Sequence, residues 1–191
     1  MKLNLPDAEI EYWADFFSKA EADALFQRLM KETPWQQDDV KIFGKVYPQP
    51  RLTAFYADGD KTLSYSGLTM KSLSWTETLA DIRNRVETAS KAKFNSVLLN
   101  LYRDGRDSNG WHADNESYLG KNPVIASVTF GEARPFQMKH NSLPIPTKKL
   151  LLEHGSLLVM GGEMQHFWKH QIPKTSKAVA PRINLTFRFV Y

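Results

Sequence analysis

The chain has 191 residues, of which 42% are hydrophobic, 12% aromatic and 24% charged, and this indicates one globular domain with a sizeable core. It contains no cysteine, which excludes disulfides, zinc–cysteine sites and iron–sulfur clusters and leaves any metal to histidine and carboxylate ligands. No run approaches the roughly 18 apolar residues of a membrane span. The N-terminus has no apolar signal core, so we expect a cytoplasmic or nuclear protein. The net charge of +4 is compatible with a polyanionic partner but is equally typical of an ordinary soluble protein.

Two segments in the first half of the chain have helical patterns. Ser18 and Glu21 form a capping box, in which Ser18 is the N-cap and Glu21 the N3 residue. Apolar residues at helical spacing follow, so we predict a helix over residues 18–32. A second capping box at 74–77 precedes an apolar stripe at 75–89 and predicts another helix. Both helices are expected to pack on a sheet as scaffold.

Between these helices, residues 40–47 alternate in a way that predicts a strand or a hairpin. Phe43 lies beside Gly44 and between Lys41 and Lys45. A bulky apolar side chain at a tight turn, flanked by lysines, suits a wedge that enters a base stack while the lysines meet phosphates. An ordinary core phenylalanine in an edge strand has the same pattern, and the pattern alone favours that simpler interpretation.

From residue 94 onward the pattern changes to short strands separated by turn signals. Two helices followed by such strands predict an α+β protein with a double-sheet β core, such as a jelly roll. The first of these strands is mostly apolar but carries Asn100 and Tyr102 on one face. Buried polar groups need partners, so these two side chains bond either to other protein groups or to a ligand.

The last predicted strand alternates without interruption. Its apolar face comprises Ile183, Leu185, Phe187 and Phe189, and its polar face comprises Arg182, Asn184, Thr186 and Arg188. The default interpretation is an amphipathic strand with its polar face in water. If that face instead lines the inside of a barrel, its two arginines need anions. A small dicarboxylate would serve, because guanidinium pairs bidentately with carboxylate.

A candidate metal site begins at Trp111-His112-Ala113-Asp114. Residues i and i+2 of an extended chain point to the same side, so one cation can contact both His112 and Asp114. A solvated loop has the same pattern, and a metal site needs a third ligand. His166 and His170 could bind a metal by themselves if they shared a helix. Residue types alone do not choose the third ligand among His140, His154, His166 and His170.

Together these motifs resemble the iron(II)/2-oxoglutarate oxygenases of the AlkB type, which dealkylate nucleic acid bases. The resemblance covers the chain from about residue 40 to its end, and its best stretches are 100–102, 112–114, 125–131, 154–158 and 180–188. Segments 42–45 and 66–69 are similar to the branch of duplex-DNA repair enzymes. The resemblance implies a single domain over 1–191 with a double-stranded β-helix (jelly-roll) core flanked by N-terminal helices. Residues 1–93 would carry the helices and a nucleotide-recognition lid, and residues 94–191 the core.

The resemblance also implies a set of ligand-binding residues. His112, Asp114 and His170 would hold Fe(II) as a facial triad, which leaves three open positions for 2-oxoglutarate and O2. Arg182 and Arg188 lie six residues apart, about 20 Å along an extended strand, so they can serve one small ligand only by reaching toward each other. We expect Arg182 at the distal carboxylate and Arg188 nearer the iron. The full set expected to hold 2-oxoglutarate is Asn100, Tyr102, Arg182, Asn184, Thr186 and Arg188.

The implied reaction is oxidative demethylation of 1-methyladenine and 3-methylcytosine in DNA, a direct repair that releases formaldehyde, succinate and CO2. The base must leave its stack, and Tyr65 would stack on it opposite His112 while Phe43 fills the gap. The residue after the aspartate ligand is often acidic in this family; here it is Asn115, and the neighbouring Glu116 is the substitute we expect. An expected pocket aromatic is replaced by Leu63. The substrate-binding set is Phe43, Gly44, Lys45, Tyr65, Ser66, Asn115 and Glu116.

Two other interpretations stay open. The same iron chemistry could act on RNA, a protein side chain or a lipid, and a non-catalytic binding module could use the same scaffold. Phe43 with its flanking lysines, and the pI of about 9.2, favour nucleic acid. The intact ligand set favours an enzyme. We expect a monomer that binds alkylated DNA and 2-oxoglutarate but no membrane, either in the cytoplasm at the nucleoid or in the nucleus.

Overall fold

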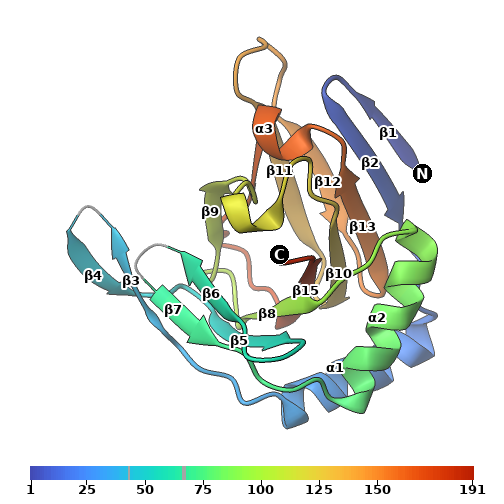
Figure 1. The fold of residues 1–191 in the computed structure, drawn as a ribbon, viewed down its shortest axis with the longest axis vertical. Coiled ribbons are helices and arrows are strands. Elements are labelled where there is room, and N and C mark those ends of the chain that lie inside the picture. The colour runs from blue at the N-terminus through green and yellow to red at the C-terminus, as the bar shows by residue number, and fades with distance from the viewer. Residues whose placement is uncertain (43, 66–67) are drawn as a thin grey trace.

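The computed structural model describes residues 1–42, 44–65 and 68–191. Two antiparallel sheets face each other across an apolar interior (Figure 1). The larger sheet has the order β1-β2-β13-β10-β15-β8-β5 and the smaller one the order β12-β11-β14-β9. The larger sheet consists of β1 (Lys2–Leu5), β2 (Ala8–Trp13), β5 (Leu52–Ala57), β8 (Ser96–Tyr102), β10 (Ile125–Gly131), β13 (Ser156–Gly161) and β15 (Arg182–Arg188). The smaller sheet consists of β9 (Asn109–His112), β11 (Arg134–His140), β12 (Lys148–Leu152) and β14 (Trp168–Ile172).

These two facing sheets agree with the predicted α+β class and its jelly-roll core. β1, β2 and β5 come from the first 93 residues, so the larger sheet draws strands from both halves of the chain. Besides the two long helices described below, a four-residue helix α3 (Met164–Phe167) and a short 3-10 turn (Ser117–Leu119) lie in connections. Among the described residues, no helix is long and apolar enough to cross a membrane.

Helices α1 (Lys19–Glu32) and α2 (Glu77–Ser90) cover the face of the larger sheet that points away from the smaller one (Figure 1). Leu29 of α1 and Ile82 of α2 share a cluster with Leu185 of β15, which explains why apolar residues repeat at helical spacing in both helices. The capping box of α1 is confirmed: the Ser18 N–H donates to Glu21 Oε2 over 3.0 Å, and the Glu21 N–H donates to Ser18 Oγ over 3.4 Å.

The predicted capping box at 74–77 is wrong. Helix α2 begins three residues later than Ser74, because Thr76 is its N-cap. Thr76 has an extended backbone, and its hydroxyl oxygen accepts the N–H of Leu79 over 3.2 Å. That bond satisfies one of the free N–H donors at the start of the helix, which is the capping role predicted for Ser74. Trp75 precedes the helix and stacks on Phe187 with ring centroids 6.4 Å apart.

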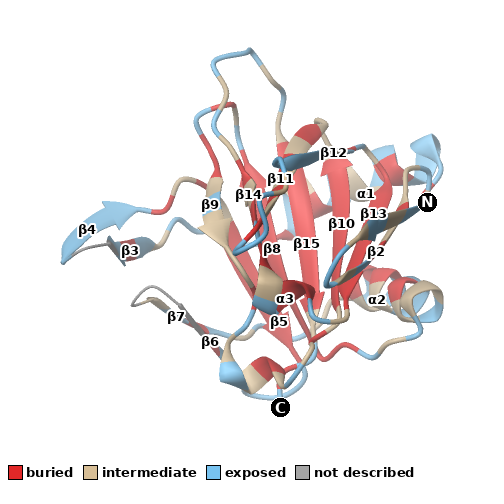
Figure 2. Cartoon of the chain, turned by 90° about the horizontal axis from the view of Figure 1, so that it is seen from above, coloured by how far each residue is buried: buried red, intermediate tan, exposed pale blue. Residues whose placement is uncertain are grey.

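Two hairpins lie beside the sheets. The segment predicted as a strand or a hairpin is the hairpin of β3 (Asp39–Ile42) and β4 (Lys45–Pro48), with Gly44 at φ +80° in its turn. Every residue of β4 is exposed, and the hairpin projects from the body of the molecule (Figure 2). The second hairpin, β6 (Thr62–Tyr65) and β7 (Leu68–Lys71), buries Leu63 and Met70 against β5 and β8. Phe43 and Ser66 lie outside the described residues.

Strand β15 lies inside the larger sheet, between β10 and β8. Its apolar residues from Ile183 to Phe187 are buried under the helices, as predicted. The prediction for Phe189 is wrong, because the strand ends at Arg188 and Phe189 is 39% exposed beside Tyr191. The polar face of β15 is also buried, so the default interpretation of a water-facing strand does not hold (Figure 2). These polar side chains line the space between the two sheets.

Candidate active site

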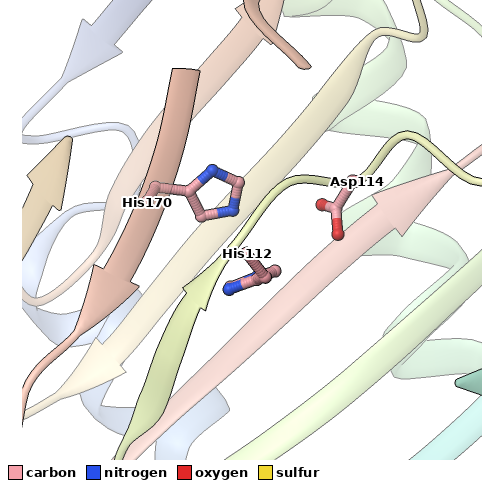
Figure 3. Close-up of side chains that lie close together, drawn as sticks. All are labelled: His112, Asp114 and His170. Carbon is pink, nitrogen blue, oxygen red and sulfur yellow. The ribbon is translucent and has the colours of Figure 1, made fainter. Parts of the chain in front are cut away.

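The smaller sheet brings two histidines together. His112 ends β9 and His170 lies on β14, and these two residues are directly opposite each other in the pairing of the strands. Asp114 lies two residues beyond the end of β9. Potential ligand atoms of His112, Asp114 and His170 all lie within 4.8 Å of one another, and the three side chains converge (Figure 3). His170 is therefore the third member of the cluster, which residue types alone did not decide.

The remaining histidines have other partners. His140 Nε2 lies 3.1 Å from Asp7, and His154 Nδ1 accepts the N–H of Gly131 over 2.8 Å. The idea that His166 and His170 form a helical pair is wrong, since α3 ends at Phe167 and His170 belongs to a strand. In the described part of the chain, the cluster of His112, Asp114 and His170 is the one group that could hold a metal.

The protonation states of this cluster suit a cation. His112 Nδ1 lies 2.7 Å from the carbonyl of Gly110, which can only accept, so Nδ1 carries the proton and Nε2 keeps its lone pair. Burial lowers the pKa of His170 to about 3, aided by His112 and opposed by Asp114, so this imidazole is neutral at neutral pH. Burial raises the pKa of Asp114, but Arg188 and the two histidines outweigh it and hold that pKa at about 2.

Two imidazoles and one carboxylate are the donor set of non-haem Fe(II) sites with open coordination positions. The residues present therefore fit Fe(II). Figure 3 shows that His112 and Asp114 come from one segment and His170 from another strand, and the pairing of β9 with β14 holds the two histidines together.

A cavity extends from this cluster between the sheets. Arg182 lies in its wall, 1% exposed, and its Nη2 donates to Thr129 Oγ1 over 2.9 Å. Its Nε and Nη1 are buried and have no hydrogen-bond partner among the described residues. Burial lowers the pKa of Arg182 to about 10, with Arg134 acting in the same direction and Tyr102 against it, so the guanidinium is charged at neutral pH.

A buried cation with two free donors is costly unless an anion pairs with it. The carboxylate of a small dicarboxylate such as 2-oxoglutarate fits this position. In the described structure, Arg182 thus has two unpaired N–H donors, and it lies next to a cavity that reaches the metal cluster. Binding of 2-oxoglutarate by the polar face of the last strand stays a prediction.

The other polar residues of β15 have protein partners. Arg188 Nη2 lies 3.0 Å from Asp114 Oδ1, so Arg188 is at the metal end of the strand. Between the two arginines, Thr186 Oγ1 donates to Asn184 Oδ1 over 2.9 Å, and Asn184 Nδ2 donates to Ser127 Oγ over 2.7 Å. The order along the strand matches the expectation of Arg188 nearer the iron. The direct roles of these residues toward 2-oxoglutarate stay predictions.

On the same wall, the neighbouring strand β8 contributes Tyr102, which pairs with Arg182, and Asn100, which pairs with Asn184; both are buried and part of the cavity lining. Arg51 Nε donates to Asn100 Oδ1 over 2.7 Å, and Arg51 Nη1 donates to the carbonyl of Ser108 over 3.1 Å. Because the carbonyl oxygen of Asn100 receives the arginine, its NH2 group is the end that is left to donate elsewhere.

A second, wider pocket opens on the other side of the metal cluster. His112, Asp114 and Arg188 line both pockets. Glu116 lies in the wall of the open pocket, whereas Asn115 is exposed and not part of its lining. The wall also includes Arg51, Leu63, Trp111 and Tyr118.

The predicted substrate residues on the hairpins are placed only in part. Gly44 lies in the turn of the β3–β4 hairpin, and Lys45 is exposed at the start of β4. The backbone of Tyr65 ends β6, but its side chain, like Phe43 and Ser66, lies outside the described part. Their contacts with a base stay predictions.

Two buried residues near the site were not predicted from the sequence. Arg51 is 7% exposed and bonds to Asn100, and a signal existed, because this arginine directly precedes the buried strand β5. Gln165 is 1% exposed, and its Oε1 accepts the backbone N–H of Asp114 over 2.9 Å. Gln165 lies on the short helix α3, for which the sequence showed no clear pattern.

Comparison with known proteins agrees with this geometry. Residues 9–188 match the model of the 2OG-Fe(II) oxygenase superfamily, whose description names both expected cofactors. The alpha-ketoglutarate-dependent dioxygenase alkB homolog 3 of Bos taurus is 41% identical over 190 residues, which cover 92% of this chain and 64% of that protein. The DNA oxidative demethylase ALKBH2 of Homo sapiens is 41% identical over 182 residues, covering 90% of this chain and 70% of that protein.

Solved structures share the fold at low sequence identity. The structure of OsALKBH1 has a TM-score of 0.67 at 15% identity and covers 99% of this chain and 100% of its own. A prolyl hydroxylase from Trichoplax adhaerens has a TM-score of 0.65 at 10% identity and covers 95% of this chain and 83% of its own. This chain spans 64% of the length of the curated alkB homolog 3 proteins that it matches. The matched family model and these relatives show that the chain belongs to the AlkB family of 2OG-Fe(II) oxygenases.

Proposed function

We propose that this protein oxidatively demethylates N-alkylated bases such as 1-methyladenine and 3-methylcytosine in DNA, and that it releases formaldehyde, succinate and CO2. One observation carries the proposal: His112, Asp114 and Arg188 line both the cavity between the sheets and the wider pocket beside it. A metal held there is accessible from both sides. A co-substrate in the cavity and a substrate in the pocket can therefore both reach this metal.

The iron, when bound, supplies the activation of O2 that couples decarboxylation of 2-oxoglutarate to hydroxylation of the N-methyl group. The chain supplies position and charge. Arg182 offers two free buried donors to a carboxylate, and Arg188 keeps Asp114 ionised. His112 Nδ1 is occupied by the carbonyl of Gly110, so this ring presents Nε2 to the metal. The hydroxylated methyl group then leaves the base nitrogen as formaldehyde.

The open pocket supports a cationic base as substrate. Glu116 places a carboxylate in the wall, and 1-methyladenine and 3-methylcytosine are positively charged. Leu63 and Trp111 provide apolar surface for a flat ring in the same pocket. The name of a relative with 41% identity, DNA oxidative demethylase ALKBH2, supports DNA as the polymer.

The β3–β4 hairpin supports contact with the strand around the base. Lys45 is exposed, and the hairpin projects from the body of the molecule (Figure 2). Val40 of β3 is part of the lining of the open pocket. We propose that Phe43, which lies between β3 and β4 in the sequence, fills the gap left by the flipped base. This reaction would place the protein with the DNA, at the nucleoid or in the nucleus, and we propose that it acts as a monomer.

The test measures succinate and formaldehyde with Fe(II), 2-oxoglutarate and an oligonucleotide that contains 1-methyladenine, single- and double-stranded. We expect both products in equal amounts, and none from His112→Ala. Loss of mainly the duplex activity in Phe43→Ala would support the wedge. Succinate without formaldehyde would overturn the DNA substrate but keep the iron chemistry, and an oligoribonucleotide is then the next substrate to test. Neither product, with metal bound, would overturn the enzyme assignment in favour of a binding module.

A further inference from the structure

The carboxylate ligand leaves its sheet before it reaches the metal. β9 ends at His112, and its pairing with β14 includes His112 opposite His170 but not Asp114. The backbone of Asp114, which is 5% exposed, therefore has no strand partner on that side. Its N–H instead donates to Gln165 Oε1 over 2.9 Å, a bond between residues 51 positions apart.

Gln165 lies on the short helix that leads into β14, the strand that carries His170. It belongs to α3, and β14 with His170 starts at the next residue after that helix. One short segment thus carries His170 and also bonds to Asp114. The same helix reaches the loop after Asp114 a second time, since His166 Nε2 lies 2.9 Å from Asn122 Oδ1.

The helix that holds Gln165 is itself well anchored. Met164 and Trp168 are both completely buried. Trp168 Nε1 donates to the carbonyl of Pro6 over 2.9 Å, and Asn141 Nδ2 donates to the carbonyl of His166 over 2.9 Å. A side chain on this turn can therefore serve as a fixed reference for the Asp114 backbone.

The two ends of the Gln165 amide have hydrogen-bond partners of different strength. Its Nε2 has the Met160 thioether sulfur at 4.0 Å, a weak acceptor, whereas its Oε1 has the Asp114 N–H. Burying an amide with one poor partner is unfavourable. An apolar residue of similar size would avoid that cost at a position that is 1% exposed. The strong bond at Gln165 is the one to the metal ligand.

We infer that Gln165 is a positioning residue for the metal: its amide oxygen fixes the backbone of Asp114 and links it to the strand of His170. Without this acceptor the buried N–H of Asp114 has no partner, and the carboxylate moves relative to the two imidazoles. Metal affinity then falls although no ligand is lost. The inference rests on the metal site of the proposed function, and it assigns to α3 a part in metal binding.

The test measures the affinity of the metal-free protein for Mn(II) by electron paramagnetic resonance, with no 2-oxoglutarate and no DNA present. Gln165→Met keeps the approximate volume and removes the acceptor, and we expect Mn(II) binding to weaken by about 10- to 100-fold, as for other residues that orient metal ligands. Gln165→Glu keeps an acceptor oxygen and is expected to recover most of the affinity. Asn141→Ala breaks a different bond to the same helix and is expected to bind Mn(II) like the unchanged protein.

Thermal unfolding of each variant separates positioning from folding. Equal Mn(II) affinity in Gln165→Met and the unchanged protein would overturn the inference, and so would an equal loss in Gln165→Glu. If Gln165→Met does not fold, Gln165→Asn gives the same comparison, because its shorter side chain keeps the amide but draws it away from Asp114. Absence of Mn(II) binding by the unchanged protein would overturn the metal site itself, which is a distinguishable result.

Discussion

Charged side chains have opposite environments in the cavity between the sheets and in the β3–β4 hairpin. In the cavity, Arg182 and Asp114 are charged and almost fully buried, so each needs a partner at a fixed position. In the hairpin, every residue of β4 is exposed, and a charge such as that of Lys45 is hydrated by water. The comparison indicates that changes in the cavity act on the chemistry itself, whereas changes in the hairpin act on the choice and affinity of substrate.

The largest effect is expected in the cavity, at the metal. His112→Ala removes one of three ligands from a half-buried position, where the fold tolerates the change. We expect succinate release to fall by about 1,000-fold or more, because the Lewis acid supplies several kcal/mol. Asn115→Ala, an exposed neighbour of Asp114, is the matched control and should keep most of the activity. Substantial turnover by His112→Ala would contradict the assignment of the ligands.

The next effect concerns the far part of the cavity. Arg182→Gln removes the buried cation, and we expect the KM for 2-oxoglutarate to rise by about 100-fold, since removing one partner of a buried charge pair costs about 2–5 kcal/mol. The KM of Arg182→Lys should lie between those of the unchanged protein and of Arg182→Gln, because lysine keeps the charge but not the planar pair of donors. The measurement is succinate release against 2-oxoglutarate concentration. An unchanged KM in Arg182→Gln would place the co-substrate elsewhere.

A smaller effect is expected in the hairpin. Lys45→Gln should raise the KM for an oligonucleotide by roughly 3-fold and reduce the slope of log affinity against log salt by about one, as for one lost phosphate contact. The KM for 2-oxoglutarate should not change, which is what separates hairpin from cavity. Lys19→Gln, on the remote helix α1, is the control. A change in 2-oxoglutarate KM in Lys45→Gln would break the distinction between the two regions.

The smallest effect on activity is expected in the helices on the outer face of the larger sheet. Ser18→Ala and Thr76→Ala each remove an N-cap and should lower the free energy of unfolding by about 1 kcal/mol. For a domain of this size that corresponds to roughly 2–4 °C in Tm. Ser74→Ala should have almost no effect, since Ser74 does not cap α2. Calorimetry measures the shifts; a larger loss from Ser74→Ala than from Thr76→Ala would reverse the assignment of the cap.

Several features could be predicted from the sequence because they depend on local periodicity. The capping box of α1 needs two residues three positions apart, and its bonds form within one turn. The alternation of β15 assigns side chains to two faces before any neighbour is known. The same alternation predicted that the side chains of His112 and Asp114 point to one side of an extended chain. Family resemblance then indicated which face of the last strand lines the cavity.

The tertiary structure decided what depends on residues far apart in the chain. Residue types left the third ligand open and the family resemblance implied His170; the pairing of β14 with β9 is what places His170 opposite His112. The partners of Arg51 and Gln165 could not be predicted, because each bond joins residues about fifty positions apart: Arg51 bonds to Asn100 and Gln165 to Asp114. Periodicity says which way a side chain points along its own strand or helix. Which distant strand lies there to meet it depends on the order and register of the sheets, and these are set by packing of the whole core.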